Sequence, residues 1–430
     1  MSLADKLSRN AASSPEPITR GTGSLWDLHH KHLPALRAKL LGNSPLMALI
    51  LIKHPEQRSE LKQRVQTLWQ QQHEHALASI ELDWITHEIF GLGPLQPLLE
   101  NENLSEVMVN SCDTVYTESH GKLELSTVHF HDENHLLSMI EKIGRFVGRQ
   151  VNHKYPMMDA RLPDGSRVNA VIPPLALHGS SLTIRRFRKK PFTLENLIEL
   201  AVISPGQRAF LELCVQGHLN IIISGGTGSG KTTLLNALSY CIPDDQRIVT
   251  IEDAAELQIN KRHVIALESR PASLDGDPPV GIRDLVINAL RMRPDRIIVG
   301  EIRGAEALDM LQAMNTGHDG SLTTGHANSP RDMLARIETM VLFAGYELPL
   351  SAIRRQIGSA LDLIIQVTRK RDGRRVIDCI MEVVGMEGDT ITTAELFRWQ
   401  GDKLCSTNIR PSFAKRLEDQ GLSLRPEMFG

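Results

Sequence analysis

An apolar run that leads into a glycine-rich stretch constrains the fold of this chain more than any other feature. The run Asn220–Ser224 is followed directly by Gly225–Thr232, which reads G-x-x-x-x-G-K-T, and Leu234, Leu235 and Leu238 then recur at helical spacing. Glycines let successive backbone N–H groups surround phosphate oxygens, and a helix N-terminus attracts an anion. This strand, loop and helix predict a nucleotide phosphate site in an α/β domain.

Two side chains of this loop carry the chemistry expected of such a site. Lys231 should reach the β- and γ-phosphates of ATP, and Thr232 should bind Mg²⁺. A chance glycine-rich turn is the alternative, and the correct strand and helix on either side disfavour it. The candidate nucleotide-binding residues are Gly225, Gly226, Thr227, Gly228, Ser229, Gly230, Lys231, Thr232 and Thr233.

Nucleotide hydrolysis also requires acidic groups at the ends of neighbouring strands, and two apolar runs supply them. The run 296–301 ends in Glu301, where Asp is the usual residue, and we expect it to meet the Mg²⁺ shell. The stretch 248–253 ends in Glu252 and Asp253, either of which could orient or deprotonate the attacking water. Salt-bridge partners remain the alternative for each of these acids.

Apolar β-type runs alternate with helical stretches from about residue 195 onward, which predicts a mostly parallel sheet with crossover helices. The expected strands are 220–224, 247–252, 296–301 and 321–324. Runs at 363–367 and 376–380 bracket Asp372-Gly373 and predict a hairpin.

The rest of the chain predicts further segments. Residues 1–25 have few large apolar side chains and read as a flexible tail, and residues 26–98 as a small helical module. Residues 99–184 predict a mixed α/β domain with a helix over 134–147 and a tight turn at Pro163-Asp164-Gly165. A basic run within 185–194 is interpreted as a linker to a motor domain over 195–430, with a solvated surface as the alternative.

Composition narrows the range of partners. A formal net charge of -3 and an aromatic content of 4% argue against nucleic acid as the main partner. The five cysteines form no CxxC pair, so we interpret them as reduced thiols. We expect no signal peptide and no transmembrane segment, because the longest apolar run, residues 46–52, is far shorter than the roughly 20 residues of a membrane span.

Four motifs in this order resemble those of type II and type IV secretion and pilus-assembly ATPases. They are the loop 225–232, the acidic box 250–257, Gly300-Glu301-Ile302-Arg303, and the histidine box 324–329. The sequence segments 159–167, 182–187 and 291–296 resemble those of CpaF/TadA-like ATPases, the tight-adherence (Flp) pilus branch of this family. The zinc-binding cysteine cluster of many extension ATPases is absent from the sequence, which favours that branch or the conjugation branch.

The resemblance implies a RecA-like motor domain after a mixed α/β domain, assembled as a homo-hexamer. It implies that Glu252 is the catalytic carboxylate and that Glu301 supports Mg²⁺. His326, with His318 as a second histidine, would sense the γ-phosphate or link it to the neighbouring domain, although a lone histidine is more often a core group. The implied role is to power pilin polymerisation from the cytoplasm, peripherally attached to the inner membrane through a platform protein, with pilin as an indirect partner.

Arginines of the N-terminal domain complete the predicted site. An arginine from another domain or subunit can stabilise the charge that develops on the transferring phosphoryl group. Arg167 and Arg185 are the first candidates for this role, followed by Arg161 and Arg186. Surface ion pairs are the alternative for any one of them.

Three other functions share parts of this pattern. A conjugation or effector-secretion ATPase would have the same catalytic motifs. A nucleic-acid translocase would also use a RecA-like ring, but the near-neutral charge argues against it. A module that binds ATP without turnover is disfavoured by Glu252 and Glu301.

Overall fold

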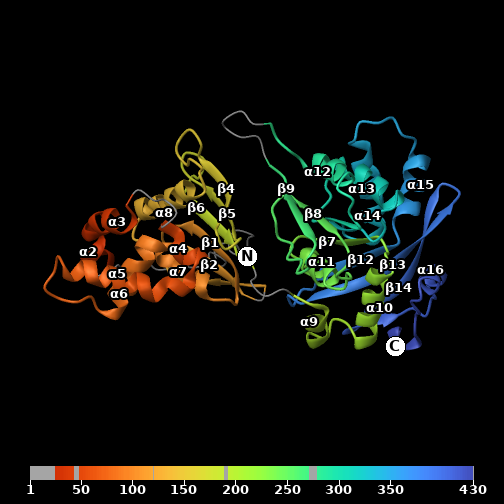
Figure 1. Cartoon of the computed structure of the whole chain (residues 1–430), viewed down its shortest axis with the longest axis horizontal. Coiled ribbons are helices and arrows are strands. Elements are labelled where there is room, and N and C mark those ends of the chain that lie inside the picture. Colours follow the sequence, from red (N-terminus) through yellow and green to blue (C-terminus); the bar gives the residue numbers. More distant parts are fainter. Residues whose placement is uncertain (1–24, 43–47, 120, 188–191, 271–277, 430) are drawn as a thin grey trace, which may run out of the picture. The chain divides into compact units, whose positions relative to one another are not determined.

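The computed structural model describes residues 25–42, 48–119, 121–187, 192–270 and 278–429. The chain divides into two compact units, Met1–Phe187 and Arg188–Gly430, which are described separately (Figure 1). Residues 1–24 of the expected tail and residues 188–191 of the expected linker lie outside the described part.

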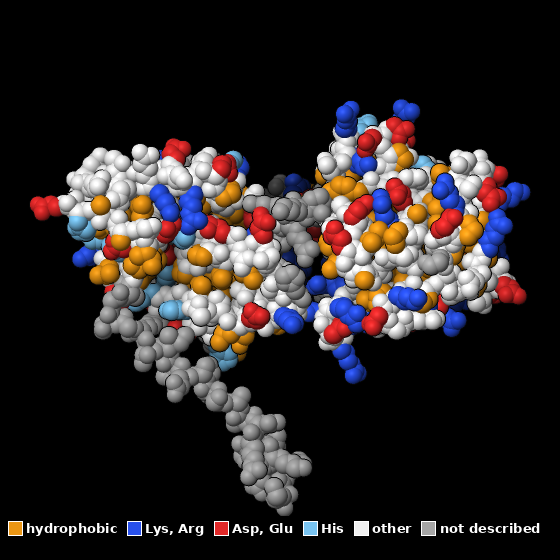
Figure 2. Space-filling view, turned by 90° about the horizontal axis from the view of Figure 1, so that it is seen from below, with side chains coloured by type: hydrophobic (Ala, Val, Ile, Leu, Met, Phe, Trp, Pro, Cys, Tyr) orange, Lys and Arg blue, Asp and Glu red, His pale blue; other side chains and the backbone are white. Residues whose placement is uncertain are grey.

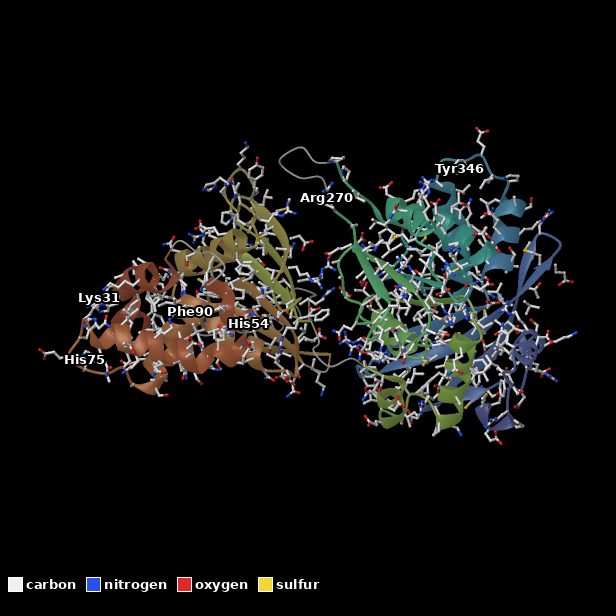
Figure 3. All side chains as sticks on the ribbon, in the orientation of Figure 1. Lys31, His54, His75, Phe90, Arg270 and Tyr346 are labelled. Carbon is white, nitrogen blue, oxygen red and sulfur yellow. The ribbon has the colours of Figure 1, made fainter. Side chains whose placement is uncertain are left out.

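The first unit begins with short helices that share a small apolar core. Leu61 and Val65 lie one turn apart on α5, and they pack with Ile85, Ile89 and Phe90 of α6 (Phe90 is labelled in Figure 3). The helices are α2 Leu25–His29, η1 His30–His32, α3 Leu33–Leu41, α4 Ile50–Lys53, η3 Pro55–Gln57, α5 Arg58–Gln70, α6 Ser79–Phe90, η4 Gly93–Leu95 and α7 Gln96–Glu100.

An antiparallel sheet and one long helix, α8 Glu133–Phe146, form the rest of the first unit. The strand order is β3-β2-β1-β6-β5-β4. Alternate residues such as Val107, Val168 and Ile184 are buried against α8, which leaves the opposite face for polar side chains. The strands are β1 Leu104–Ser111, β2 Thr114–Ser119, β3 Lys122–Leu125, β4 Met157–Arg161, β5 Arg167–Val171 and β6 Ser181–Arg185.

The second unit contains a nine-stranded sheet of order β15-β14-β13-β12-β7-β11-β10-β8-β9. Strands from β12 to β9 in this order are parallel, and β12 to β15 pair antiparallel. The strands are β7 Ile221–Gly225, β8 Ile248–Glu252, β9 Val264–Glu268, β10 Arg296–Val299, β11 Leu322–Gly325, β12 Leu363–Arg369, β13 Arg375–Glu387, β14 Thr390–Gln400 and β15 Lys403–Ser406.

Helices cover both faces of this sheet (Figure 1). Ile221 and Ile223 of β7 pack into one core cluster with α10 and α11, whereas Ile222 packs into a second cluster with α12 to α15. This alternation explains why the strands are apolar throughout, as expected for parallel strands buried on both faces. The helices are α9 Leu194–Glu199, α10 Pro205–Gln216, α11 Lys231–Ser239, α12 Ile282–Ala289, α13 Glu306–Asn315, α14 Pro330–Leu342, α15 Leu350–Ala360, α16 Ala414–Asp419 and η5 Pro426–Met428.

Most of the strands expected from the sequence are present within one or two residues of their predicted bounds. The predicted hairpin is also present, with β12 and β13 paired antiparallel and Gly373 at a positive φ of 89° in its turn. Gly165, with a φ of 92°, forms the predicted turn between β4 and β5. In the second unit, three strands, β9, β14 and β15, were not predicted. One sequence-based expectation was wrong in detail. The residues Ile80, Leu82, Ile85 and Ile89 recur at helical spacing and suggest one apolar face, but Ile80 is 68% exposed in the first turn of α6.

Basic and acidic side chains are interspersed over the second unit on the face seen in Figure 2. Within the described residues, no helix combines the length and the apolarity that crossing a membrane requires.

Candidate functional site

The phosphate loop leaves the buried strand β7 and enters helix α11, as the sequence predicts. Gly228 and Gly230 have positive φ values of 69° and 97°, and Gly230 is the N-cap of α11. These conformations strain any residue with a Cβ, so the glycines are required by the loop's path. Gly225 has a different reason for being small, because a Cβ there would lie 2.4 Å from the carbonyl oxygen of Val367 on β12.

Lys231 is held at the start of α11 with its ammonium group directed back into the loop. Its Nζ donates to the carbonyl oxygen of Gly226 at 3.0 Å and lies 3.3 Å from His326 Nδ1. The side chain is buried, and this burial, partly offset by the charge of Glu301, lowers the pKa of Lys231 from its ordinary value. The loop therefore places a positive charge where phosphate oxygens would be bound.

Glu301 and His326 meet at the ends of two adjacent strands. Glu301 follows β10, His326 follows β11, and His326 Nε2 lies 3.0 Å from Glu301 Oε1. Burial would raise the pKa of Glu301, but the hydrogen bond and charge of Arg303, at 2.7 Å, outweigh it and lower that pKa. Burial and the charge of Lys231 lower the pKa of His326, although Glu301 acts in the opposite direction. At neutral pH we therefore expect a carboxylate beside a neutral imidazole.

Glu252 lies at the end of β8, which neighbours β10 in the sheet. Its side chain is buried, and Oε1 accepts hydrogen bonds from the backbone N–H groups of Glu256 at 2.8 Å and Leu257 at 2.9 Å. Gly300, which follows β10, lies beside this side chain. A Cβ on Gly300 would lie only 2.9 Å from Glu252 Cγ, so a larger residue at position 300 would collide with Glu252. The acidic box thus orients one oxygen of this carboxylate by backbone hydrogen bonds.

The residues around Glu301 fit a magnesium ion. In the described part of the chain, Glu301 Oε1 is a buried acceptor without a hydrogen-bond partner, since its contact with His326 falls outside hydrogen-bond geometry. A buried carboxylate oxygen without a donor suits a hard cation, and the hydroxyl of Thr232 in the first turn of α11 is the oxygen ligand expected from the loop.

The strand order explains why these groups converge. The loop follows β7, His326 follows β11, Glu301 follows β10 and Glu252 ends β8, and these four strands are consecutive and parallel. Their carboxyl ends therefore lie at one edge of the sheet, which is where open α/β sheets bind ligands.

Two further residues considered from the sequence lie apart from this core. His318 precedes β11 and His326 follows it, so the two histidines lie at opposite ends of that strand. The structure therefore does not bring them together. Asp253 is more exposed than Glu252, and its Oδ2 lies 3.6 Å from an Arg303 nitrogen while Oδ1 accepts from Ser269 Oγ.

The candidate arginines of the first unit form a row across its sheet. Arg161 on β4 pairs in register with Arg167 on β5, which pairs with Arg185 on β6. Directly paired residues share a face of a sheet, so the three arginine side chains project from one face. Arg185 Nε donates to Glu106 Oε1 at 2.9 Å, and its side chain is 56% exposed. Arg186 points elsewhere and donates to the carbonyls of Asn101 and Leu104.

Sequence reasoning missed three arginines that lie at the site within the second unit. Arg303 contacts Glu301, as described above. Arg375 Nε donates to the carbonyl oxygen of Gly228 at 2.9 Å, and Arg369 is paired with Arg375 across the β12–β13 hairpin. The signal available in the sequence was the dense basic run around the hairpin turn, residues 369–375.

A cavity of about 480 Å³ adjoins His326 and Arg303. It continues along α14, where Arg336 gives it a basic wall and Met340 and Phe343 an apolar one. Its lining residues are Arg303, His326, Ala327, Asn328, Asp332, Ala335, Arg336, Thr339, Met340 and Phe343.

This chain is similar to known secretion-system proteins over most of its length. The family described as "Type II/IV secretion system protein" matches residues 88–408. The type IV secretion system protein VirB11 of Brucella suis is 35% identical over 305 residues, which cover 65% of this chain and 84% of that protein. A protein of Mycobacterium tuberculosis named as a conjugal transfer protein is 38% identical over 294 residues, covering 67% of this chain and 83% of its own.

Among solved structures, the VirB11 ATPase of Brucella suis in complex with sulphate is 32% identical and covers 67% of this chain and 95% of that one, with a TM-score of 0.37. The predicted fold class, a RecA-like α/β domain after an N-terminal domain, is confirmed. The match over residues 88–408 spans both units and every strand end of the site. The chain therefore belongs to the type II/IV secretion system ATPase family.

Proposed function

We propose that this chain hydrolyses ATP in a magnesium-dependent reaction at the edge of the second sheet. The observation that carries the proposal is the continuous set of contacts from Lys231 to His326 to Glu301 beside the phosphate loop. When nucleotide binds, Lys231 donates to the β- and γ-phosphates, and these hydrogen bonds replace the one to the Gly226 carbonyl oxygen. His326, neutral at pH 7, donates a hydrogen bond toward the γ-phosphate without a change of charge.

Glu252 orients and deprotonates the attacking water. Its carboxylate is buried at the end of β8, and two backbone N–H groups fix its direction, which is the preorganisation that a general base requires. Thr232 and Glu301 hold Mg²⁺, which when bound neutralises charge on the phosphate oxygens.

The transition-state cation comes from the first unit of the same or a neighbouring chain. Arg167 and Arg185 remain the candidates, because they stand side by side on one face of their sheet. A guanidinium supplied in this way would make hydrolysis depend on assembly, for which we propose a homo-hexamer.

The work done by this motor is the polymerisation or secretion of pilin through an inner-membrane platform protein, in a Flp (tight-adherence) pilus. The motif phrases at 159–167, 182–187 and 291–296 support this branch. In this proposal the chain acts in the cytoplasm, attached to the membrane only through the platform protein.

A second candidate is a conjugation or effector-secretion ATPase of the type IV kind. The observation that favours it is the identity of 35% to 38% with a VirB11 protein and with a protein named for conjugal transfer. Crosslinking in cells followed by identification of the bound inner-membrane protein separates the two. Capture of a pilus platform protein supports the first candidate, and capture of a conjugation channel component supports the second.

Replacing Lys231 tests the hydrolysis itself. Lys231→Ala should reduce phosphate release from ATP by at least about a hundredfold, because it removes the full positive charge that the loop directs at the phosphates. Lys261→Ala is the matched control, since Lys261 lies outside the loop and pairs with the exposed carboxylate of Asp244 at 2.8 Å. A folded Lys231→Ala protein with the turnover of the control would show that the loop is not the catalytic phosphate site.

A further inference from the structure

The β12–β13 hairpin contacts the phosphate loop through one arginine. Arg375 Nε donates to the carbonyl oxygen of Gly228 at 2.9 Å, and its Cδ lies 3.4 Å from the position a Cβ would take on Gly230. Arg375 thus spans the two residues of the loop that have left-handed backbone conformations. A donor on the Gly228 carbonyl holds that oxygen away from the loop interior and favours the neighbouring N–H groups pointing inward.

A second arginine lies beside the first. Arg369 is the register partner of Arg375, and its Nη1 lies 3.9 Å from the position of a Cβ on Gly228. Strand β12 runs parallel to β7 with Val367 opposite Gly225, so Arg369 is two residues beyond the point where the loop begins. Two guanidinium groups from one hairpin therefore converge on the tip of the phosphate loop.

The strand order says which part of a nucleotide these arginines would meet. Glu301 and His326 follow β10 and β11, which lie on one side of β7, and they mark the γ-phosphate end. Strands β12 and β13 lie on the other side of β7. A phosphate chain whose middle lies in the loop must direct its α-phosphate and nucleoside toward that second side.

The turn of the β12–β13 hairpin is rich in basic residues, and ion pairs hold some of them. Residues 369–375 contain five basic residues and one acidic residue, Asp372. Lys370 pairs with Asp378 at 2.9 Å, and Arg374 pairs with Asp372 at 2.6 Å and with Asp402 at 3.0 Å. Lys370 and Arg374 are therefore held on nearby acids. Arg369 and Arg375 are placed beside Gly228 and Gly230 of the loop.

We propose that Arg369 and Arg375 form the α-phosphate side of the nucleotide site. Arg369 binds the α-phosphate of a nucleoside di- or triphosphate directly. Arg375 is a positioning residue that fixes the loop through the Gly228 carbonyl. This inference rests on the nucleotide site of the proposed function, and it adds a determinant of ADP and ATP affinity that is separate from the groups acting on the γ-phosphate.

Ligands of different length separate the two roles. In calorimetric titrations, Arg369→Gln should weaken ADP binding by about tenfold, the value expected for one charge-assisted hydrogen bond, and should leave inorganic pyrophosphate binding within about twofold of wild type. Arg375→Gln should weaken both ligands, because the loop itself loses its tether. Arg375→Lys, which keeps a donor and a charge, should recover part of the lost affinity for both.

Steady-state kinetics give a second readout that a general structural defect would not produce. Both glutamine variants should raise the KM for ATP by about tenfold while kcat at saturating ATP stays within about twofold, because the γ-phosphate groups are untouched. Arg374→Gln is the matched control from the same hairpin and should leave KM and ADP affinity unchanged. Thermal unfolding of each variant checks that the fold is retained.

The outcomes distinguish this inference from the proposed function. If wild type binds ADP and both glutamine variants bind it equally well, or if Arg374→Gln weakens binding as much as they do, the arginine pair is not part of the site. If wild type binds ADP but hydrolyses no ATP, the proposed function fails while the ADP titrations still decide this inference. A wild-type protein that binds neither ADP nor ATP would overturn both.

Discussion

Glu252 and Glu301 are both carboxylates at strand ends, and at the scale of single residues their surroundings differ in a way that fits the two roles we propose. Two backbone N–H groups, of Glu256 and Leu257, donate to Oε1 of Glu252 and orient its carboxylate. Glu301 instead lies among Arg303, His326 and Lys231, and the hydrogen bond and charge of Arg303 lower its pKa despite its burial. The first environment suits a base that acts on water, and the second suits a permanently ionised ligand for a cation.

Amide substitutions test this division of labour. Glu252→Gln should still bind Mg-ATP with an affinity within about threefold of wild type and should lose at least about a hundredfold in kcat, because the amide cannot accept a proton. Glu301→Gln should also weaken the Mg²⁺-dependent part of ATP binding. ATP titrations with and without Mg²⁺ measure the difference, and identical defects in the two variants would contradict the separate roles.

At the scale of elements, a buried lysine joins two helices of the first unit. Lys142 on α8 donates to the carbonyl oxygens of Glu88 at 2.9 Å and Gly91 at 2.6 Å, at the end of α6. Burial and the charge of Arg37 lower the pKa of Lys142 to about 7, although the Glu88 carboxylate acts in the opposite direction. His135 Nε2 lies 3.1 Å from Oε1 of that carboxylate.

This burial makes the stability of the first unit depend on pH. Below about pH 7 Lys142 is charged in the folded and the unfolded chain, and the cost of burying the charge is fully present. Between pH 7 and 10.5 the folded chain releases this proton first, so stability rises with pH. The free energy of unfolding of wild type relative to Lys142→Met should therefore increase by roughly 1 kcal/mol per pH unit over this range.

Urea unfolding followed by tryptophan fluorescence measures this effect. Trp26, Trp69 and Trp84 pack in the first unit, so three of the four tryptophans report on it. Lys122→Met, a substitution of an exposed lysine on β3, provides the matched control and should show a constant difference from wild type. A Lys142→Met difference that does not change between pH 7 and 9 would refute the assignment.

At the scale of the whole molecule, the proposed catalytic groups and the row of arginines belong to different units. The phosphate loop, acids and His326 lie in the unit 188–430, whereas Arg161, Arg167 and Arg185 lie in the unit 1–187. If the arginines act on a neighbouring chain, two different defective variants can complement each other in one assembly. One variant then supplies the intact arginine and the other supplies the intact site of the second unit.

Mixed assemblies test this sharing. Arg185→Ala should lower kcat by about a hundredfold with little change in ATP affinity, because the cation acts on charge that develops in the transition state. Mixing Arg185→Ala with Glu252→Gln should restore part of the activity, since some interfaces then combine an intact arginine with an intact glutamate. Arg64→Ala, on the exposed side of α5, controls for loss of charge.

Two results together would show that the site is complete within one chain. One is the absence of recovery in the mixtures at any ratio. The other is a specific activity of wild type that stays constant on dilution to concentrations where the assembly dissociates.

The spacing of residues close together in the sequence was enough to predict many of the strands, turns and site motifs of this protein. The loop 225–232, the acidic strand ends and the hairpin turn at Gly373 follow from residues within a few positions of one another, because strands, turns and helix starts depend on local backbone preferences. The same reasoning missed β9, β14 and β15. Strands at the sides of a sheet carry weaker patterns, since neighbours far along the chain decide their pairing.

Tertiary structure decided which residues meet. His326 contacts Lys231 across 95 positions and Arg375 contacts Gly228 across 147, and no local pattern encodes either contact. Arg296, part of a family-like phrase, is fully buried and donates to Gln246 and to the carbonyls of Val215 and Gly320, so its place is in the framework. The sequence could identify the chemical groups because chemistry resides in side chains, but only the order of the strands sets which of them share an edge.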